Sequence, residues 1–386
     1  MIIELHLLQS FPVSNLNRDD VGQPKTATFG GCTRARISSQ SLKRAARLLF
    51  DQHGLDTAET GVRTKRLLTE AAKVLAERGK HSDDAVAVAE AGLAALGFGI
   101  DKNTKLTEYL LFVGRQAVEL LADFCAENWD ALLATANKKR GKKGETEDGE
   151  KSTKDKAKKA KPDKVTEEKA KRILDARRAV DVAMFGRMIA DNKDFNVDAA
   201  SQVAHAISTH AVANEFDYYT AVDDLKPDDE SGADMIGTVD FNAACYYRYA
   251  NLNLAQLAAN LDGDLDLVTR GARAWLSAFV HAVPGGKQNS MAALTLPETL
   301  LGVVRERGAW NLANAFLRPV TGSDLMATST ARLAEHFERI RGFYGDSQIR
   351  SVTAASLAGD LSSLDNVDVA SNLDDFIARV LASTKA

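Results

Sequence analysis

The first residues of the chain alternate between apolar and polar side chains. Ile3, Leu5 and Leu7 fall at every second position, which predicts a half-buried strand over residues 2–9. A polar segment with several glycines runs from Asn15 to Thr33 and predicts a loop. Beyond it, apolar residues recur at intervals of three and four, so the chain is expected to open as strand, loop and helix.

The helix expected near residue 40 has two opposed faces. Its apolar face consists of Leu42, Ala45, Ala46 and Leu49, and its polar face consists of Gln40, Lys43, Arg44 and Arg47. The two sets are offset by two residues, which is about 200° of helix, so one face packs on a core while the other presents cations. Ser38 or Ser39 is expected to cap the start of the helix.

The middle of the chain has a helical pattern. Alanine-rich and leucine-rich segments such as Asp84 to Leu96 and Glu108 to Leu121 predict a helical insertion from about Thr57 to Ala136. Residues 137–171 consist almost wholly of Lys, Glu, Asp, Gly, Ala and Thr, which cannot bury enough apolar area to offset the ordering entropy, so a disordered, solvated loop is expected there. A helical pattern returns from Glu167 to about Asp191.

The second half of the chain predicts further strands and helices. A helix is expected from Ala199 to His210, and two β-rich segments separated by a Pro-containing and Gly-containing turn predict a protruding hairpin that continues into a core strand. Another helix and another strand complete the pattern. The segments are Glu215 to Val222 and Ile236 to Leu254 for the hairpin, Leu265 to Ala282 for the helix, and Met291 to Leu296 for the strand. This order predicts an α+β fold with a ferredoxin-like or RRM-type sheet.

Composition limits the classes of protein that fit. The chain has 386 residues, 45% of them hydrophobic, with a formal charge of −4 and a pI of about 6.0, so nucleic acid could be bound only by a local basic patch. The chain has three cysteines, Cys32, Cys125 and Cys245, and no C-x-x-C motif, which argues against a disulfide framework and a structural zinc site. This cysteine content favours a reducing cytoplasm. Because no signal segment and no run of 18 apolar residues occurs, we expect neither export nor membrane insertion.

One short stretch, Phe29 to Arg47, gathers the strongest chemical signal. It combines the pair Gly30-Gly31, the upstream cations Arg34 and Arg36, and the cationic face of the helix. Free N–H groups and the dipole at a helix N-terminus favour an anion, so the stretch predicts a site for a phosphate backbone. The alternative is an ordinary solvated helix, since clustering of Lys and Arg does not prove binding.

The chain also contains several longer motifs: Asn15-Leu16-Asn17-Arg18-Asp19-Asp20, Phe29-Gly30-Gly31, Arg36 to Ala45, Ala204-His205-Ala206-Ile207, Phe216 to Leu225, Tyr247 to Asn251, and Asn314-Ala315-Phe316. Together these motifs resemble the CasC family, the RNA-binding backbone subunit of type I-E CRISPR Cascade. The motifs span most of the chain. The Lys-rich segment and roughly the last 60 residues add little to the resemblance.

The resemblance implies an RRM-like palm, a large helical fingers insertion and a β-hairpin thumb. The expected boundaries are 1–54 for the first part of the palm, 55–198 for the fingers with the disordered loop 137–171, 199–212 for a palm helix, 213–240 for the thumb, and 241–386 for the second part of the palm with C-terminal helices. Several copies of such a subunit form a helical filament on CRISPR RNA (crRNA) without cutting it.

The resemblance also implies roles for particular residues. Backbone contacts of the family fall on Lys25, Ser38, Gln40, Lys43 and Arg47. The thumb residues that kink the RNA correspond to Tyr219, Thr220 and Val222, with Met188 on the facing side; the family often has Phe at the position of Tyr219. The complete set of expected RNA contacts is Lys25, Arg18, Arg34, Arg36, Ser38, Gln40, Lys43, Arg44, Arg47 and Lys287. Candidate contacts to target DNA are Lys169, Lys171 and Arg172.

The expected partners are crRNA, target DNA, further copies of the chain, and the other Cascade subunits: the large subunit, the small subunit, the subunit that binds the 5′ handle, and the crRNA-processing endonuclease. No cofactor and no metal is expected. Two alternatives stay open: a metal-dependent endoribonuclease that uses Asp19 or Asp20, and a scaffold that self-associates without RNA. His205 and His210 are five residues apart, which favours core or capping roles over metal binding.

Overall fold

The computed structural model describes residues 1–101, 103–141, 164–173, 178–189, 195–221, 224 and 235–385. The chain forms two compact units, and each is described by itself. Unit 1 comprises Met1–Leu55, Ala200–Ala258 and Asp264–Ala386, and unit 2 comprises Asp56–Ala199 with Ala259–Gly263. Both helices and strands are abundant, and the expected α+β class is confirmed.

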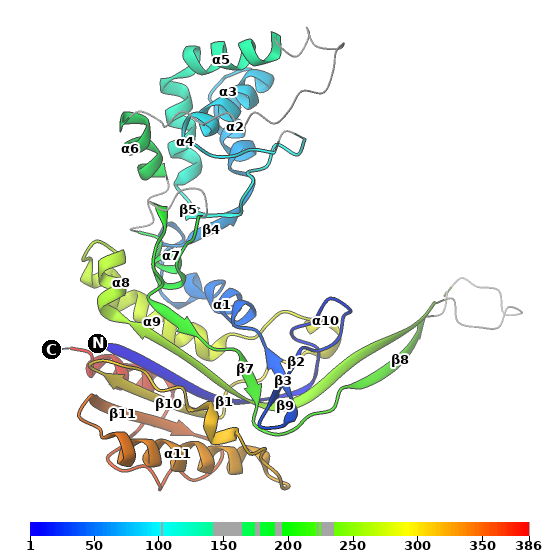
Figure 1. Cartoon of the computed structure of the whole chain (residues 1–386), viewed down its shortest axis with the longest axis vertical. Helices are drawn as coiled ribbons and strands as arrows, with labels where there is room; N and C mark the ends of the chain where they lie inside the picture. Colours follow the sequence, from blue (N-terminus) through cyan, green and yellow to red (C-terminus); the bar gives the residue numbers. More distant parts are fainter. Residues whose placement is uncertain are drawn as a thin grey trace, which may run out of the picture. The chain divides into compact units, whose positions relative to one another are not determined.

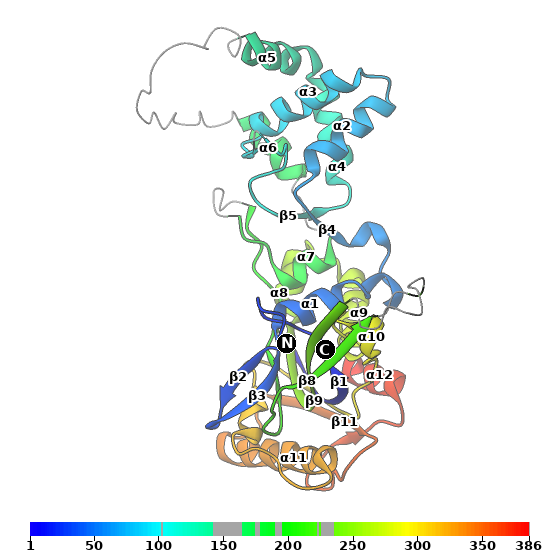
Figure 2. The same ribbon diagram turned by 90° about the vertical axis from the view of Figure 1, so that its right-hand side faces the viewer.

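Unit 1 is built on one mostly antiparallel sheet with the strand order β12-β11-β10-β1-β9-β7-β3-β2, in which β6 and β8 also pair with β9. Only the β11–β12 pair is parallel among these described strands. Figure 2 shows β2 and β3 at one edge of this sheet. The strands are β1 (Ile2–Ser14), β2 (Thr26–Phe29), β3 (Cys32–Ile37), β6 (Ser201–Val203), β7 (Ala206–Ser208), β8 (Glu215–Ala221), β9 (Met235–Asn253), β10 (Thr299–Arg305), β11 (Ile349–Ser356) and β12 (Asp368–Val369).

Helices cover both faces of this sheet (Figure 1). On one face, Leu42 of α1 packs with core residues such as Ile37 and Ala244. On the other, Leu8 packs with Phe337 of α11 and with Phe316 of a 3-10 helix, η4. The helices of unit 1 are α1 (Ser39–Arg47), α9 (Leu265–His281), α10 (Gln288–Met291), α11 (Leu325–Tyr344) and α12 (Leu373–Ala382), with the 3-10 helices η1 (Phe50–His53) and η4 (Leu312–Phe316); α8 (Leu254–Asn260) lies where the two units meet in the sequence.

The first strand is buried on both faces, so the expectation of a half-buried strand is wrong. Glu4 and His6, whose polarity indicated a solvent face, are each 1% exposed. The Tyr249 hydroxyl donates to Glu4 Oε1 at 2.9 Å, and the His6 ring lies 2.9 Å from the Tyr247 hydroxyl. These partners satisfy the Glu4 carboxylate and one ring nitrogen of His6, so polar side chains can lie on a face that helices cover.

The segment expected to be one loop, Asn15 to Thr33, contains a hairpin. β2 pairs with β3 in register from Thr26↔Ala35 to Phe29↔Cys32, and Gly30 and Gly31 form the two-residue connection. Their φ angles are +63° and +79°, a combination that glycine adopts without steric cost and that matches the twist of a tight hairpin. The glycine pair is therefore explained by the turn, which corrects its interpretation as part of a phosphate cradle.

Two predicted elements differ in type or position. Residues 199–212 do not form a palm helix; they contain the short strands β6 and β7, both paired with β9. Pairing with a long central strand overrides the weak helical pattern here, as tertiary contacts often do for short segments. The strand expected at Met291 to Leu296 is also wrong, since α10 ends at Met291 and the next strand, β10, begins at Thr299.

Unit 2 is mainly helical around an alanine-rich and leucine-rich core that includes Leu68, Val88 and Leu121. The helix expected at Asp84 to Leu96 is confirmed by α3. Most of the first half of the segment Glu108 to Leu121 is instead the buried strand β5, which pairs with β4. The elements are η2 (Thr57–Glu59), β4 (Gly61–Thr64), α2 (Leu67–Glu77), α3 (Ser82–Ala95), β5 (Leu111–Gly114), α4 (Ala117–Glu127), α5 (Trp129–Gly141), α6 (Lys164–Ile173) and α7 (Val180–Phe185).

The loop expected at 137–171 is helical at both ends, because α5 extends to Gly141 and α6 begins at Lys164. Its central part, residues 142–163, lies outside the described residues. Among the helices that the structure describes, none is long and apolar enough to cross a membrane.

The predicted hairpin is confirmed as β8 and the first part of β9. The two strands pair in register from Glu215↔Phe241 to Ala221↔Met235, and this ribbon extends away from the sheet (Figure 1). Beyond this ribbon β9 continues into the central sheet as a neighbour of β1. Val222, a predicted thumb residue, lies outside the described residues.

Candidate nucleic-acid interface

Hydrogen bonds from backbone N–H groups to three side chains hold the N-terminal turn of helix α1. The Ser38 side chain accepts from the Ser41 N–H at 3.3 Å, so the predicted serine cap is confirmed. The N–H of Ser38 donates to Asn17 Oδ1 at 2.8 Å, and the N–H of Ser39 donates to His205 Nδ1 at 3.4 Å. Because side chains take several of these donors, fewer N–H groups at the helix terminus remain available to an anion.

The two-faced character of α1 is confirmed. Leu42 and Ala46 are buried against the core, while Ala45 and Leu49 are partly buried. On the opposite side Gln40 and Arg44 are exposed, and Lys43 and Arg47 are partly exposed. The helix therefore presents one cationic side, here called the cationic face and defined as Gln40, Lys43, Arg44 and Arg47.

Two further cations lie beside the start of α1. The N–H of Arg36 donates to the carbonyl of Lys25 at 2.8 Å, so these two residues are neighbours across the β2–β3 edge. The Arg36 guanidinium lies 3.2 Å from His205 Nδ1. Burial, followed by the charges of Arg36 and Lys25, lowers the pKa of His205 below its ordinary value. Arg36 and Lys25 therefore both add positive charge around His205, beside the start of α1.

Arg34 does not belong to this surface, which corrects its prediction as an RNA contact. It is 0% exposed. Its guanidinium donates to the carbonyls of Phe29, Ser208 and Phe316 at 3.2, 3.1 and 2.7 Å, and it lies 3.4 Å from that of Leu317. A buried arginine whose guanidinium makes four contacts with carbonyls fixes the edge of the sheet, and its burial removes it from the surface that a phosphate could reach.

The loop before β2 holds Arg18, Asp19 and Asp20. Arg18 is exposed. The Asp19 carboxylate accepts from the N–H groups of Val21 and Gln23 at 3.0 and 2.9 Å, so Asp19 shapes a turn. No group of three or more His, Cys, Asp or Glu side chains suited to a metal occurs in the part of the chain that the structure describes.

Lys287 lies on an exposed turn of unit 1. The turn approaches the backbone of the segment before Arg18 so closely that a Cβ on Gly286 would lie 2.4 Å from the Leu16 carbonyl oxygen. Lys287 itself adopts a φ of +52° and is exposed. A glycine at 286 is therefore required by packing, and Lys287 remains an exposed cation on this turn.

The predicted thumb residues lie on the hairpin of β8 and β9. Tyr219 is 40% exposed and lies opposite Gly237, where a Cβ would come within 2.5 Å of the tyrosine ring. The ring therefore covers the bare backbone of its cross-strand glycine, which fixes its position. Thr220, on the other side of the ribbon, is exposed.

Met188, in unit 2, is 86% exposed on a well-anchored segment. Arg187 before it exchanges backbone hydrogen bonds with Val197, and the N–H of Ile189 after it donates to Asn196 Oδ1 at 2.6 Å. A large apolar side chain presented to solvent from a fixed backbone is a typical contact residue.

The candidate DNA contacts lie on α6 of unit 2. Lys169 forms an ion pair with Glu127 at 2.6 Å, while Arg172 is exposed. The Lys171 side chain lies outside what the structure describes. Of the three, Arg172 has the most accessible side chain among those described.

Sequence reasoning missed two residues of the interface. His205 was expected to be a core or capping residue, and the capping role is confirmed by its bond to Ser39, but its closeness to Arg36 was not foreseen. Asn17 fixes the Ser38 N–H from 21 residues away. Both lie inside motifs that resemble the CasC family, and that is the one sequence signal that marked them.

Comparisons with known proteins show the family of the chain and two similar solved chains. The chain matches the CT1975-like protein family over residues 3–379 and belongs to that family. It is similar to a chain of a solved "CRISPR RNA-guided surveillance complex, pre-nicking", with a TM-score of 0.83, 32% identity, and coverage of 99% of this chain and 100% of that one. A chain of a second "CRISPR RNA-guided surveillance complex" has a TM-score of 0.74 and 27% identity over the full length of both chains. A comparison with the curated proteins gives no match.

Proposed function

We propose that the chain is a non-catalytic backbone subunit of a CRISPR surveillance complex, of type I-E, and that several copies bind one crRNA. The proposal rests on one observation above all: the cationic face of α1 adjoins Lys25 and Arg36 at the edge of the sheet. The family and the two similar surveillance-complex chains support it.

The proposed RNA-binding surface contacts the sugar and phosphate groups of the RNA. Cations and N–H groups contact phosphate oxygens without reading base edges, so such a surface holds any guide sequence. In this proposal Lys25, Lys43 and Arg47 contact phosphates, Gln40 and Ser38 donate hydrogen bonds, and Arg18, Arg36, Arg44 and Lys287 extend the positive surface. Arg34 has a structural role instead.

The hairpin is the element that distorts the RNA. An apolar or aromatic side chain inserted between bases unstacks them at a cost of a few kcal/mol per step, which stacking and phosphate contacts offset. We assign this role to Tyr219 and Thr220, with Met188 and Val222. Guide segments displayed between the kinks pair with target DNA, and base pairing supplies the sequence specificity. Contacts to the DNA would come from unit 2, foremost from Arg172, and the other Cascade subunits would complete the assembly.

The proposal is tested by the nucleic-acid content and RNA affinity of the purified chain. Co-expression with a CRISPR transcript should yield oligomers whose absorbance ratio at 260 and 280 nm indicates bound RNA. Labelled RNAs of unrelated sequence should then bind RNA-free protein with similar affinities, because phosphate contacts carry no base information. A stable oligomer free of RNA that ignores added transcripts at low ionic strength would support the protein-only scaffold.

A further inference from the structure

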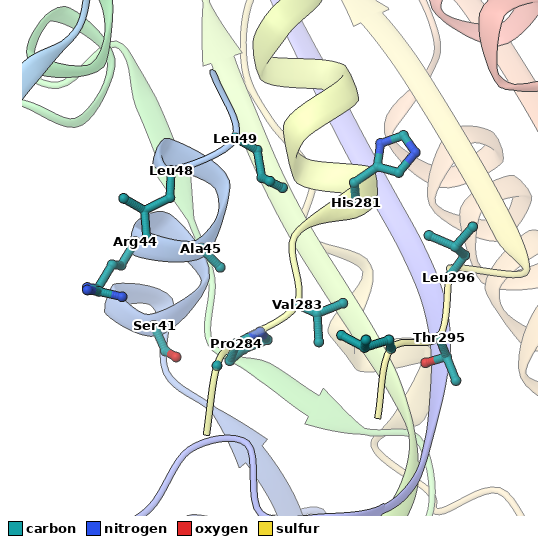
Figure 3. Close-up of a pocket in the computed structure, with 12 residues that line it drawn as sticks. Ser41, Arg44, Ala45, Leu48, Leu49, His281, Val283, Pro284, Thr295 and Leu296 are labelled. Carbon is teal, nitrogen blue, oxygen red and sulfur yellow. The ribbon is translucent and has the colours of Figure 1, made fainter. Parts of the chain in front are cut away.

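Arg248 of β9 lies inside unit 1, between the central sheet and the helices α1 and α9. It is the register partner of Leu7 on β1, and it is 2% exposed. α1 and α9 pack side by side on this face of the sheet, and Figure 3 shows Leu49 at the end of α1 near His281, the last residue of α9. A guanidinium group is therefore buried in the core beneath two helices.

The hydrogen bonds of Arg248 go to neutral acceptors. Its Nη1 donates to the side-chain oxygen of Gln9, and its Nη2 donates to the carbonyl of Phe279 at 2.5 Å. Its Nε is buried and has no hydrogen-bond partner among the described residues. The buried Arg305 differs in this respect, because its guanidinium lies 3.4 Å from the Glu4 carboxylate.

The charge of Arg248 is only partly offset. Phe279 provides one of the last four carbonyls of α9, and the C-terminal end of a helix carries roughly half a negative charge, so about half of the guanidinium charge remains. Burial lowers the pKa of Arg248 to about 10, which still leaves the side chain protonated at neutral pH. A buried charge without a counter-charge is unfavourable, so an anion that could reach the guanidinium would be bound.

A small cavity adjoins this guanidinium. Its volume is about 10 Å³, which is space for one particle of the size of a water molecule. The other lining residues are aliphatic or aromatic, among them Leu42 of α1 and Phe279 of α9. Tyr249 is also in the lining, but its hydroxyl donates to Glu4 on the opposite face of the sheet. The cavity therefore offers one charged donor in apolar surroundings.

A halide ion fits these surroundings better than water does. A water molecule needs 2–4 polar partners, and the lining provides no side-chain acceptor for its O–H groups. A halide is a single atom slightly larger than water that accepts hydrogen bonds and has no donor to satisfy, and its charge is opposite to that of the guanidinium. Anions with several heavy atoms, such as acetate or phosphate, exceed the volume of the cavity.

We propose that Arg248 binds one halide ion, chloride under ordinary conditions, through Nε in this cavity. The ion completes the hydrogen bonds of the guanidinium and neutralises its remaining charge. Because Leu42 lines the cavity, the ion lies on the core side of α1, whose opposite side is the cationic face. The inference goes beyond the proposed function and does not depend on it, since no RNA contact enters the argument. Chloride should then stabilise the chain as a ligand of the folded state does.

The first test is thermal unfolding of the full chain at constant ionic strength, with sodium gluconate replaced stepwise by sodium chloride. Gluconate is too large for the cavity. The unfolding midpoint should rise by about 2 °C for each tenfold increase in chloride beyond half-saturation, and bromide should have the same effect. Arg248→Met should abolish this dependence, whereas Arg350→Met, at an exposed arginine of β11, should keep it. Equal midpoints in gluconate and chloride, or the full rise in Arg248→Met, would overturn the proposal.

The second test needs no variant to fold. Crystals of the unmodified chain soaked in sodium bromide should give an anomalous diffraction peak within hydrogen-bond distance of Arg248 Nε. A water molecule without anomalous signal, or no density in the cavity, would show that the halide site does not exist. A bromide peak together with a midpoint that ignores chloride would mean binding at crystal concentration only, which would equally refute a site in solution.

Discussion

The guanidinium of Arg36 lies 3.2 Å from Nδ1 of His205, 169 residues further along the chain. The same ring nitrogen accepts from the N–H of Ser39. Nδ1 must therefore be unprotonated, with the proton of the neutral ring on Nε2. The His205 side chain thus connects Arg36, at the edge of the sheet, to the start of helix α1.

This arrangement predicts how stability depends on pH. The pKa of His205 is lowered in the folded chain, so its contribution is fully present above the unfolded value of about 6.5 and is lost as the pH falls through the folded pKa. His205→Gln removes this titration. Thermal unfolding followed between pH 7.5 and 5.5 should show a smaller loss of stability in the variant. Parallel curves for the two proteins would contradict the arrangement.

Arg34 and Arg36 should respond to mutation in opposite ways. Arg34→Ala leaves buried carbonyls without donors and should lower the free energy of unfolding by about 2–4 kcal/mol. RNA affinity of the folded fraction should hardly change. Arg36→Ala should cost little stability but weaken RNA binding, because it removes a cation from the surface. Denaturant unfolding and RNA titration of both variants give the comparison, and similar behaviour of the pair would refute the assignment of Arg34 to the core.

The ring of Tyr219 should matter more than its hydroxyl. Tyr219→Ala uncovers Gly237 and removes the wedge, so periodic nuclease protection of bound RNA should weaken while the RNA still binds. Tyr219→Phe keeps the ring and should retain the pattern. Gly237→Ala should displace the ring, since the new Cβ would meet it at 2.5 Å, and should resemble Tyr219→Ala. An unaltered footprint in Tyr219→Ala would count against the wedge.

The acidic loop offers a test of the endoribonuclease alternative. Asp19→Ala removes the acceptor for two N–H groups and should destabilise the loop by roughly 1 kcal/mol, as loss of a comparable cap does. Asp20→Ala should change neither stability nor RNA binding. Assembled complex incubated with Mn²⁺ and complementary RNA should leave that RNA intact. Cleavage that Asp20→Ala abolishes would establish the enzyme.

The amphipathic helix α1 could be predicted because its signal is local. Helical spacing separated Leu42 and Ala46 from Lys43 and Arg47, and the structure keeps that separation. The hairpin was also predicted, since its β-rich strands flank a turn segment. The local hydrophobic pattern is sufficient to predict a helix or strand when one of its faces is buried and the other is exposed.

The local sequence pattern does not predict a residue's burial where contacts with distant segments determine it. Arg34 is buried by carbonyls of Ser208 and Phe316, which are 174 and 282 residues away, so nothing nearby distinguishes it from Arg36. Likewise the polarity of Glu4 and His6 predicts a solvent-exposed face of the first strand. Both side chains are buried, because they contact Tyr249 and Tyr247 on β9. The short strands β6 and β7 are defined by pairing with β9, which their own sequence does not encode.

The central claim is that the cationic face of α1 holds the RNA through its phosphates. The most direct measurement is the salt dependence of RNA affinity for Arg47→Gln, with Arg339→Gln as control, an exposed arginine on α11 across the sheet. Loss of one phosphate contact should reduce the slope of log affinity against log salt by about 0.7, equally for unrelated RNA sequences, while the control keeps the full slope. An unchanged slope in Arg47→Gln, or a loss that depends on the RNA sequence, would contradict the account.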